Sequence, residues 1–127
     1  MAYNVIITGT RAFNDYELLK EKCDIFLSTL LGGSDSDDEI TIITGDDGNA
    51  EELAQQYAAE NEYPVVVYPL DVDKYGPIAG TIRDAAMVDV ANCAICFWNG
   101  NSKGVKTTIT LCKQKDITCE VIKYNNK

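Results

Sequence analysis

The chain has 127 residues, 46% of them hydrophobic and 24% charged, which fits one globular domain over residues 1–127 and is too short for two cores. Its formal net charge of −9 makes nucleic acid an improbable main partner, because binding to a phosphate backbone normally requires a basic face. Apolar runs long enough to span a bilayer are absent. A strand-like run at residues 4–7 stands where a signal peptide would have its apolar core. We therefore expect a cytoplasmic protein without a membrane partner.

Short β-rich runs alternate with helix-length segments along the chain. The β-rich runs predict strands at residues 3–8, 39–44, 64–68, 91–98 and 118–124. The helical segments are expected at residues 15–31 and 49–61, in a stretch that ends near 88 after a long connection over 69–80, and after 99–101 as far as 114. An acidic, glycine-containing run at residues 32–38 is interpreted as a solvated loop.

This alternation is typical of an α/β domain with a parallel sheet and helical crossovers. We predict a single Rossmann-like three-layer domain of about five mostly parallel strands in the order 3-2-1-4-5, with helices on both faces. The run at residues 64–68 is almost wholly apolar, and we therefore expect that strand to be buried on both faces.

The chain contains five cysteines and no histidine, so acid–base catalysis by histidine is excluded. Cys93 and Cys96 have C-x-x-C spacing, but they lie in an apolar strand, where residues three apart point to opposite faces. Zinc would also need further ligands. We interpret the cysteines as reduced thiols that pack in the core.

Glycine-containing segments follow the strands at the edge where open parallel sheets bind ligands. Glycine lets the backbone approach a ligand closely, and three of the segments also carry a cation. Arginine suits phosphate or carboxylate, and Ser102 is placed to begin a helix whose free N–H groups attract anions. The candidate ligand-binding residues are Gly9, Thr10, Arg11, Gly45, Asp46, Asn49, Gly80, Arg83, Gly100, Ser102, Lys103 and Gly104.

Each segment also has a purely structural interpretation. Ser102 could serve only as a helix cap, and Arg11 could pair with an acidic neighbour on the surface. The prediction is that Arg11, Arg83, Ser102 and Lys103 converge in one pocket. Neither a G-x-G-x-x-G fingerprint after the first strand nor a P-loop is present, which disfavours an ordinary dehydrogenase or a P-loop ATPase.

Three stretches match motifs in a fixed order. Residues 9–16 match G-S-R-x-F-x-D-Y, residues 74–84 match K-Y-G-x-x-A-G-x-x-R-N with Asp84 in place of Asn, and residues 97–105 match F-W-x-G-x-S-K-G-T with Val105 in place of Thr. On these motifs the chain resembles the SLOG superfamily, specifically its YspA-like, cpYpsA-related group, over residues 3–122.

The resemblance implies a Rossmann-like fold that recognises a nucleotide or a nucleotide-derived, phosphate-bearing small molecule. Relatives include signalling-nucleotide sensors in bacterial conflict systems and LOG-type phosphoribohydrolases, which cleave a base from a nucleoside monophosphate. Some relatives self-associate, so a homo-oligomer is a further expectation.

The loop after the second strand departs from the group's G-G-x-R-G-A-D pattern. Asp46 replaces the second glycine, Gly48 stands at the arginine position, and Glu51 holds the acidic position. Two carboxylates close to a phosphate would repel it unless a cation intervenes. A changed ligand, a metal-bridged ligand and a decayed site therefore all stay open.

The aspartates of this loop have two interpretations. In the plain one, Asp46 and Asp47 favour the dipole and cap the N–H groups of the following helix, and Asn49 caps the helix or takes a left-handed turn. In the other, Asp46 and Asp47 hold Mg²⁺ between the protein and phosphate oxygens. Mg²⁺ is the one cofactor that the sequence brings into consideration.

Binding or sensing of a nucleotide-like molecule is the first functional prediction, because it needs only the loops and cations named above. The alternative is a nucleotide N-glycosidase, for which Glu51, Asp46 and Asp84 are the candidate catalytic carboxylates. The LOG signature P-G-G-x-G-T-x-x-E is absent, which weakens that alternative. Single-strand nucleic-acid binding, as in DNA-processing protein A relatives, fits the acidic balance least.

Overall fold

The sheet has five parallel strands in the order β3-β2-β1-β4-β5. The computed structural model describes residues 2–30, 39–46 and 48–124, so the loop predicted at 32–38 lies outside the described residues. The strands are β1 (Ala2–Gly9), β2 (Glu39–Gly45), β3 (Val65–Tyr68), β4 (Cys93–Trp98) and β5 (Thr118–Lys123). The predicted α/β class, strand order and parallel pairing are confirmed.

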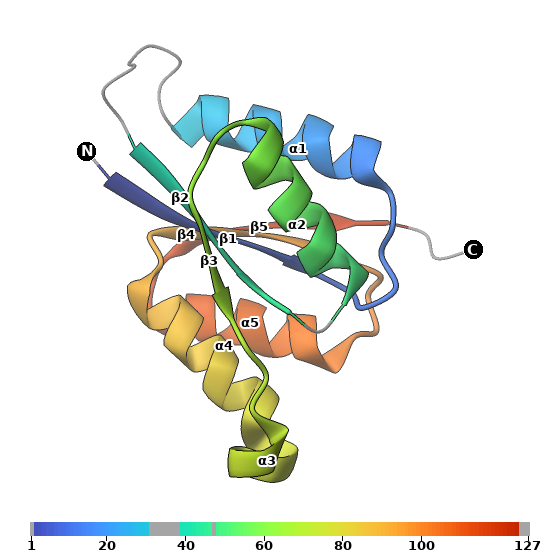
Figure 1. Cartoon of the computed structure of the whole chain (residues 1–127), viewed down its shortest axis with the longest axis vertical. Coiled ribbons are helices and arrows are strands. Elements are labelled where there is room, and N and C mark those ends of the chain that lie inside the picture. The colour runs from blue at the N-terminus through green and yellow to red at the C-terminus, as the bar shows by residue number, and fades with distance from the viewer. Residues whose placement is uncertain (1, 31–38, 47, 125–127) are drawn as a thin grey trace.

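Helices cover both faces of this sheet (Figure 1). The long helices are α1 (Tyr16–Leu30), α2 (Asn49–Glu60), α4 (Ala79–Val90) and α5 (Lys103–Gln114). Helices α1 and α2 lie on one face, and α4 and α5 lie on the other. The result is the three-layer arrangement expected from right-handed crossovers between parallel strands.

The long connection before α4 is not a simple loop. It contains a short helix α3 (Val72–Tyr75) and a 3₁₀ turn η1 (Gly76–Ile78). Asp71 begins α3, because its carboxylate accepts a hydrogen bond from the N–H of Lys74 at 3.1 Å. The sequence interpretation missed this short helix, although an aspartate before it and Pro77 in the following turn are both local signals.

Alternation along the strands divides the core in two. Val5 and Ile7 pack with α1 and α2, whereas Ile6 packs with α4 and α5. Cys93 likewise belongs to the α1/α2 side, whereas the Cys96 sulfur lies 3.8 Å from that of Cys119, a β5 residue that packs on the α4/α5 side. The prediction that the C-x-x-C residues point to opposite faces is therefore confirmed.

Strand β3 is not buried as predicted. Its valines at positions 65, 66 and 67 are 39%, 45% and 36% exposed. The strand stands at the end of the order, so it has a neighbour on one side only, and an all-apolar run does not distinguish such an edge strand from a central one. None of the described helices is both long and apolar enough to cross a membrane.

Candidate functional site

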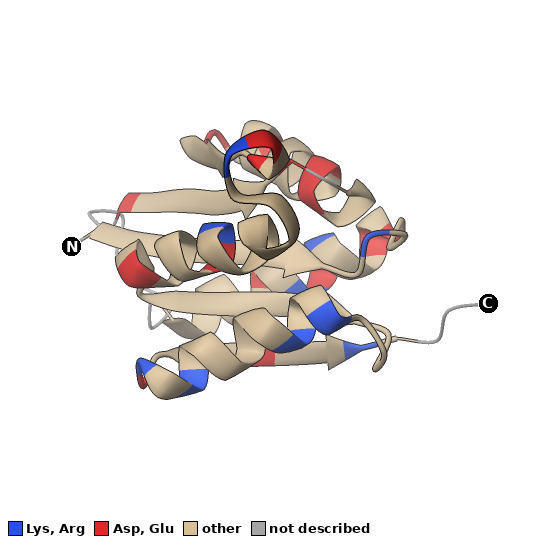
Figure 2. Cartoon of the chain, turned by 90° about the horizontal axis from the view of Figure 1, so that it is seen from below, with Lys and Arg blue, Asp and Glu red and all other residues tan. Residues whose placement is uncertain are grey.

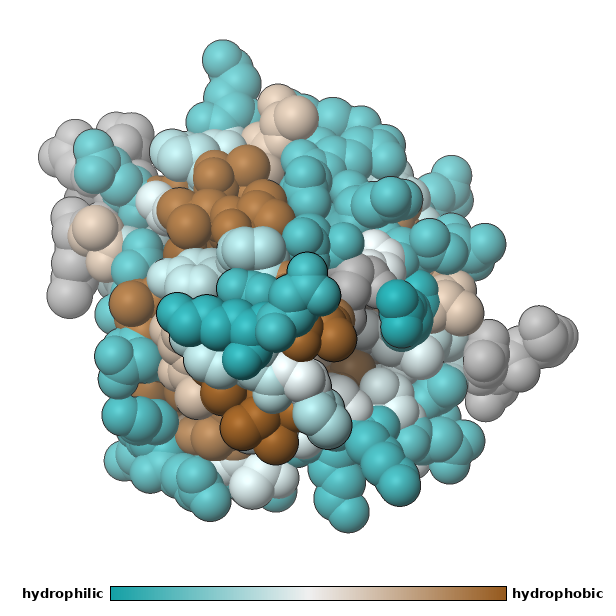
Figure 3. All heavy atoms as spheres, turned by 60° about the horizontal axis from the view of Figure 1, so that its bottom comes forward, coloured by the Kyte–Doolittle hydropathy of each residue, from teal (hydrophilic) through white to brown (hydrophobic). Residues whose placement is uncertain are grey.

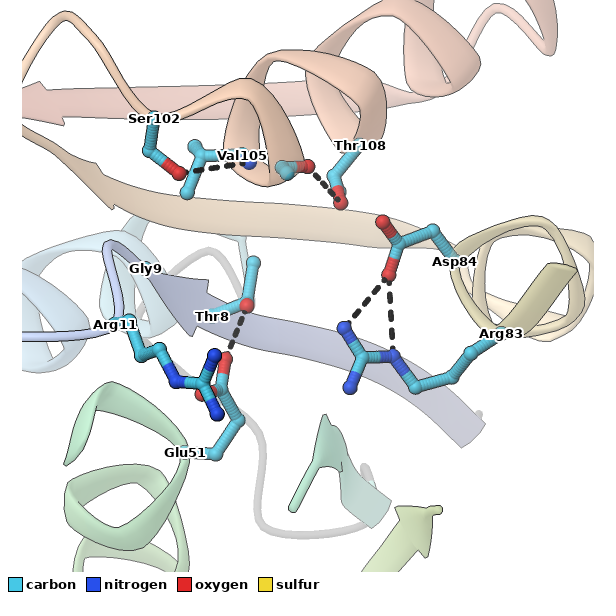
Figure 4. A pocket seen from close by; sticks show the side chains of 10 residues that line it. Thr8, Gly9, Arg11, Glu51, Arg83, Asp84, Ser102, Val105 and Thr108 are labelled. Atoms are coloured by element: carbon cyan, nitrogen blue, oxygen red, sulfur yellow. Dashed lines mark hydrogen bonds and ion pairs between the residues drawn. The ribbon is translucent and has the colours of Figure 1, made fainter. Parts of the chain in front are cut away.

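A polar pocket of about 220 Å³ opens where the carboxyl end of β1 faces the start of α5. In this strand order β1 has β2 on one side and β4 on the other. The direction of the strand order reverses between β1 and β4, and open α/β sheets bind ligands at such a switch point. The strand-end pocket is lined by Thr8, Gly9, Arg11, Glu51, Arg83, Asp84, Ser102, Gly104, Val105 and Thr108. In Figure 4 the Arg11 and Arg83 side chains extend into this space from opposite sides.

Gly9 is needed where β1 ends because its neighbours are too close for a side chain. A Cβ atom there would lie 2.7 Å from the Phe97 carbonyl oxygen and 3.0 Å from the Ala50 side chain. The missing Cβ lets β4 and the start of α2 close over the end of β1, which brings the next residues to the mouth of the pocket.

Arg11 is positioned by the loop that departs from the family pattern. The Asn49 N–H donates to the Arg11 carbonyl at 2.9 Å, which ties the start of α2 to the loop after β1. A Cβ atom on Gly48 would lie 3.1 Å from both Cα and Cγ of Arg11 and 2.9 Å from a carboxylate oxygen of Glu51. Glycine at the family's arginine position thus makes room for Arg11 and Glu51.

Glu51 brings a buried carboxylate into the pocket. Its exposed fraction is 3%, and its Oε2 accepts a hydrogen bond from the Thr8 hydroxyl at 2.5 Å. A buried carboxylate requires such donors, because an unsatisfied charge in the interior is costly. Thr8, which the sequence interpretation missed, is therefore the residue that orients Glu51 at the strand end.

Arg83 and Asp84 enter the pocket together from α4. Nε and Nη2 of Arg83 each lie 3.3 Å from Oδ1 of Asp84, which is 5% exposed. A Cβ atom on Gly45 would lie only 2.7 Å from Nη1 of Arg83. Gly45 therefore contributes to the site indirectly, since the guanidinium group packs against the bare backbone at the end of β2.

The N-terminus of α5 forms the wall next to β4. Ser102 caps the helix by accepting from the Val105 N–H at 3.4 Å, and the Trp98 indole N–H donates to the Ser102 carbonyl at 3.0 Å. The first N–H groups of a helix lack acceptors within the helix and attract anions. The charged residues of α5 are all lysines, seen as blue bands along one helix in Figure 2.

The predicted ligand-binding residues fall into three groups. Gly9, Arg11, Arg83, Ser102 and Gly104 line the strand-end pocket, whereas Lys103 and Gly80 line an adjoining groove. The other five residues shape the surrounding loops. Gly45 packs under Arg83, and the Asn49 N–H donates to the Arg11 carbonyl. The Thr10 hydroxyl accepts from the Asn99 N–H, the Asp46 carboxylate accepts from the Leu70 N–H, and Gly100 has a positive φ of 91°.

The expectation that Asp46 or Asn49 caps α2 is wrong. The N-cap residue is Gly48, and among the described residues no side chain caps this helix. The Asp46 carboxylate instead holds the segment after β3 through the Leu70 N–H at 3.2 Å, and Asn49 is the first helical residue, without a positive φ. Asp47 lies outside the described residues. Among the residues that the structure describes, no group of three or more acidic or cysteine side chains could hold a metal ion, and the Mg²⁺ bridge stays a prediction.

Fold and site together are those of a Rossmann-like α/β protein with a polar pocket at the carboxyl ends of its strands. The chain belongs to the YspA, cpYpsA-related SLOG family, whose model matches residues 3–75. Membership places it among nucleotide-related Rossmann-like domains. The match includes Arg11, Gly45 and Glu51, while Arg83 and α5 lie beyond it. Comparison with curated proteins and with solved structures gave no match.

Proposed function

We propose that this protein binds or senses a nucleotide or nucleotide-derived molecule whose phosphate-bearing part occupies the strand-end pocket. The observation that carries the proposal is the joint presence, in one pocket of about 220 Å³, of two arginines, a capped helix N-terminus and two buried carboxylates. These groups come from four separate segments of the chain and meet at the switch point of the sheet.

The pocket suits a molecule that carries both an anionic group and hydroxyl groups. Arg11 and the N-terminus of α5 offer positive partners for a phosphate. The carboxylates of Glu51 and Asp84 balance the charges of the two arginines, and carboxylates only accept hydrogen bonds when ionised. Sugar hydroxyls are donors that match such acceptors, so a sugar phosphate satisfies both halves of the pocket.

The local charge explains how an acidic protein can bind an anion. The net charge of the chain is −9, but α5 begins with Lys103 and carries no acidic residue. Ordered N–H groups and nearby cations act over short distances, within about 10 Å at 0.1 M salt. Glu51 and Asp84 offset the two arginines within the pocket, so the net positive field there comes from the N-terminus of α5 and the nearby Lys103.

Native mass spectrometry of the purified protein tests the proposal, because a co-purified ligand would appear as an added mass. Thermal-shift titration with AMP and ADP-ribose follows, on wild type, on Arg11→Gln and on Lys113→Gln. Lys113 lies in the last turn of α5, so this variant loses the same charge away from the pocket. Stabilisation that Arg11→Gln reduces and Lys113→Gln keeps supports the proposal. Equal loss in both variants contradicts it.

The alternative function is N-glycosidic cleavage of a nucleotide, with water adding to the sugar C1′ and the base leaving with a proton. Two of its three candidate carboxylates, Glu51 and Asp84, line the pocket, whereas Asp46 does not. Chromatography of AMP or ADP-ribose incubated with the protein separates the two functions. Free base that disappears in Glu51→Gln favours hydrolysis, and intact nucleotide favours binding alone.

A further inference from the structure

A second groove of about 370 Å³ adjoins the strand-end pocket. The two share Arg83, Asp84 and Gly104 in their walls, so these residues separate two adjoining depressions. The second groove, called here the apolar groove, is lined by Leu70, Val72, Gly76, Pro77, Ala79, Gly80, Thr81 and Thr107 together with Lys103 and the shared residues.

The size of the strand-end pocket limits what it can hold. At about 220 Å³ it is smaller than the roughly 300–1,000 Å³ of typical sites for drug-sized molecules. It accommodates the compact sugar-phosphate part of a nucleotide, and the remainder of the molecule has to lie in a neighbouring depression. The apolar groove shares three lining residues with the strand-end pocket, whereas a smaller depression beside Tyr68 and Tyr75 shares only Arg83.

The face beside the groove exposes apolar side chains that the core does not use. Val72 is 54% exposed and Ile78 is 59% exposed, and the face in Figure 3 carries separate hydrophobic patches on either side of a hydrophilic band. Exposed apolar side chains beside polar groups are common in binding sites. The flat face of a nucleobase is a suitable partner for such a surface.

Two glycines keep the groove open. A Cβ atom on Gly80 would find only the Leu70 Cδ1 atom, at 3.9 Å, and one on Gly104 only the Ser102 Oγ atom, at 4.0 Å. Packing within the protein therefore does not demand glycine at either position. In α4, Gly80 even lowers helix stability relative to alanine, which is consistent with a position kept free for a ligand.

We propose that the apolar groove binds the base of the nucleotide-like ligand, between the segment from Leu70 to Pro77 and the start of α5. The inference rests on the proposed function, since it assumes that the sugar-phosphate part lies in the strand-end pocket. Base and phosphate then lie on either side of Arg83 and Asp84, which line both depressions.

The test compares AMP with ribose 5-phosphate, which lacks the base, by calorimetric titration. Wild type should bind AMP at least about 10-fold more tightly, as expected when an apolar ring is buried. Gly80→Leu should fill the groove and weaken AMP about 10-fold while leaving ribose 5-phosphate unchanged. Val90→Ser is the control, since Val90 is 41% exposed at the far end of α4 and away from the groove, and it should keep the affinity for AMP within about 3-fold of wild type.

Val72→Ser provides a second variant at an exposed position, where folding is not at risk, and it too should weaken AMP selectively. Equal affinities of wild type for AMP and ribose 5-phosphate would overturn the base site while leaving the sugar-phosphate pocket intact. Failure of both AMP and ribose 5-phosphate to bind would overturn the proposed function itself. If the apolar face instead covers a second copy of the chain, sedimentation will show a dimer that Val72→Ser dissociates without any selective loss of AMP, which also overturns the inference.

Discussion

Replacing Gly45 by alanine should disturb ligand binding through Arg83 without unfolding the protein. The new Cβ atom would lie 2.7 Å from Nη1 of Arg83, whereas ordinary contacts begin at 3.4 Å, so the guanidinium group has to move by about 0.7 Å. A hydrogen bond of about 2.9 Å lengthened by that amount is no longer a hydrogen bond. The loss of one charged hydrogen bond to the ligand is worth about 1.5–3 kcal/mol, or roughly 10- to 150-fold in affinity.

Stability should hardly change in this variant. Gly45 is not among the glycines with a positive φ, so alanine can adopt its backbone conformation, and the atom that has to yield is the end of a flexible side chain. Alanine also restricts the unfolded chain, which stabilises by about 0.4–1 kcal/mol. We expect a melting temperature equal to or slightly above that of wild type.

Calorimetric titration with AMP measures the effect, and a double-mutant cycle with Arg83→Gln identifies its cause. Because Gly45→Ala acts through the guanidinium group, it should weaken AMP in the wild-type background and have little effect in the Arg83→Gln background. An equal loss in both backgrounds, or unchanged affinity in the single variant, would refute the reasoning.

Three further predictions concern the walls and the core. Ser102→Ala should lower the free energy of unfolding by about 0.5–1 kcal/mol through loss of the helix cap, while Ser102→Asn should restore it in urea titrations. Thr8→Val should cost about 1–3 kcal/mol at pH 7, because the buried Glu51 carboxylate loses a donor, whereas Thr8→Ser should retain most of the stability. Burial raises the pKa of the Cys93 thiol from 9.0 to about 11, so the contribution of Cys93 to the free energy of unfolding should be constant below about pH 8 and fall between about pH 9 and 11, where the unfolded thiol ionises and the folded one does not. The Cys93 part of that fall, about 2–3 kcal/mol, should be absent from Cys93→Ala, and an identical pH profile in that variant would contradict the assignment.

The sheet was predictable because its information is local and periodic. Apolar runs of strand length, separated by helix-length segments, predict parallel pairing with helices on both faces. The order 3-2-1-4-5 is one of the common orders compatible with that pattern. The exposure of β3 was not predictable in this way, because Val65 to Val67 have the composition of a central strand and only their place at the end of the order exposes them.

The sequence predicted which strand-end loops contribute to the candidate site, but it did not predict the side-chain contacts between them. Sequence spacing brings Arg11 and Ser102 to the same edge, yet only the three-dimensional structure shows that Thr8 donates to Glu51 and that Arg83 packs on Gly45. The structure also places Lys103 in the lining of the apolar groove and not in that of the strand-end pocket. The signal for the missing residue was the polar Thr8 directly after the apolar run from Val5 to Ile7.

The central claim is that a phosphate-bearing, nucleotide-like molecule binds at the carboxyl ends of the strands, and backbone amide spectra recorded during a titration with AMP test it most directly. The account predicts saturable shifts of the amide signals of Gly9, Arg11 and Gly104, which line the pocket. Shifts confined to the opposite edge of the sheet, where Asn4 bonds to Asn92, or no shifts at millimolar AMP, would contradict it.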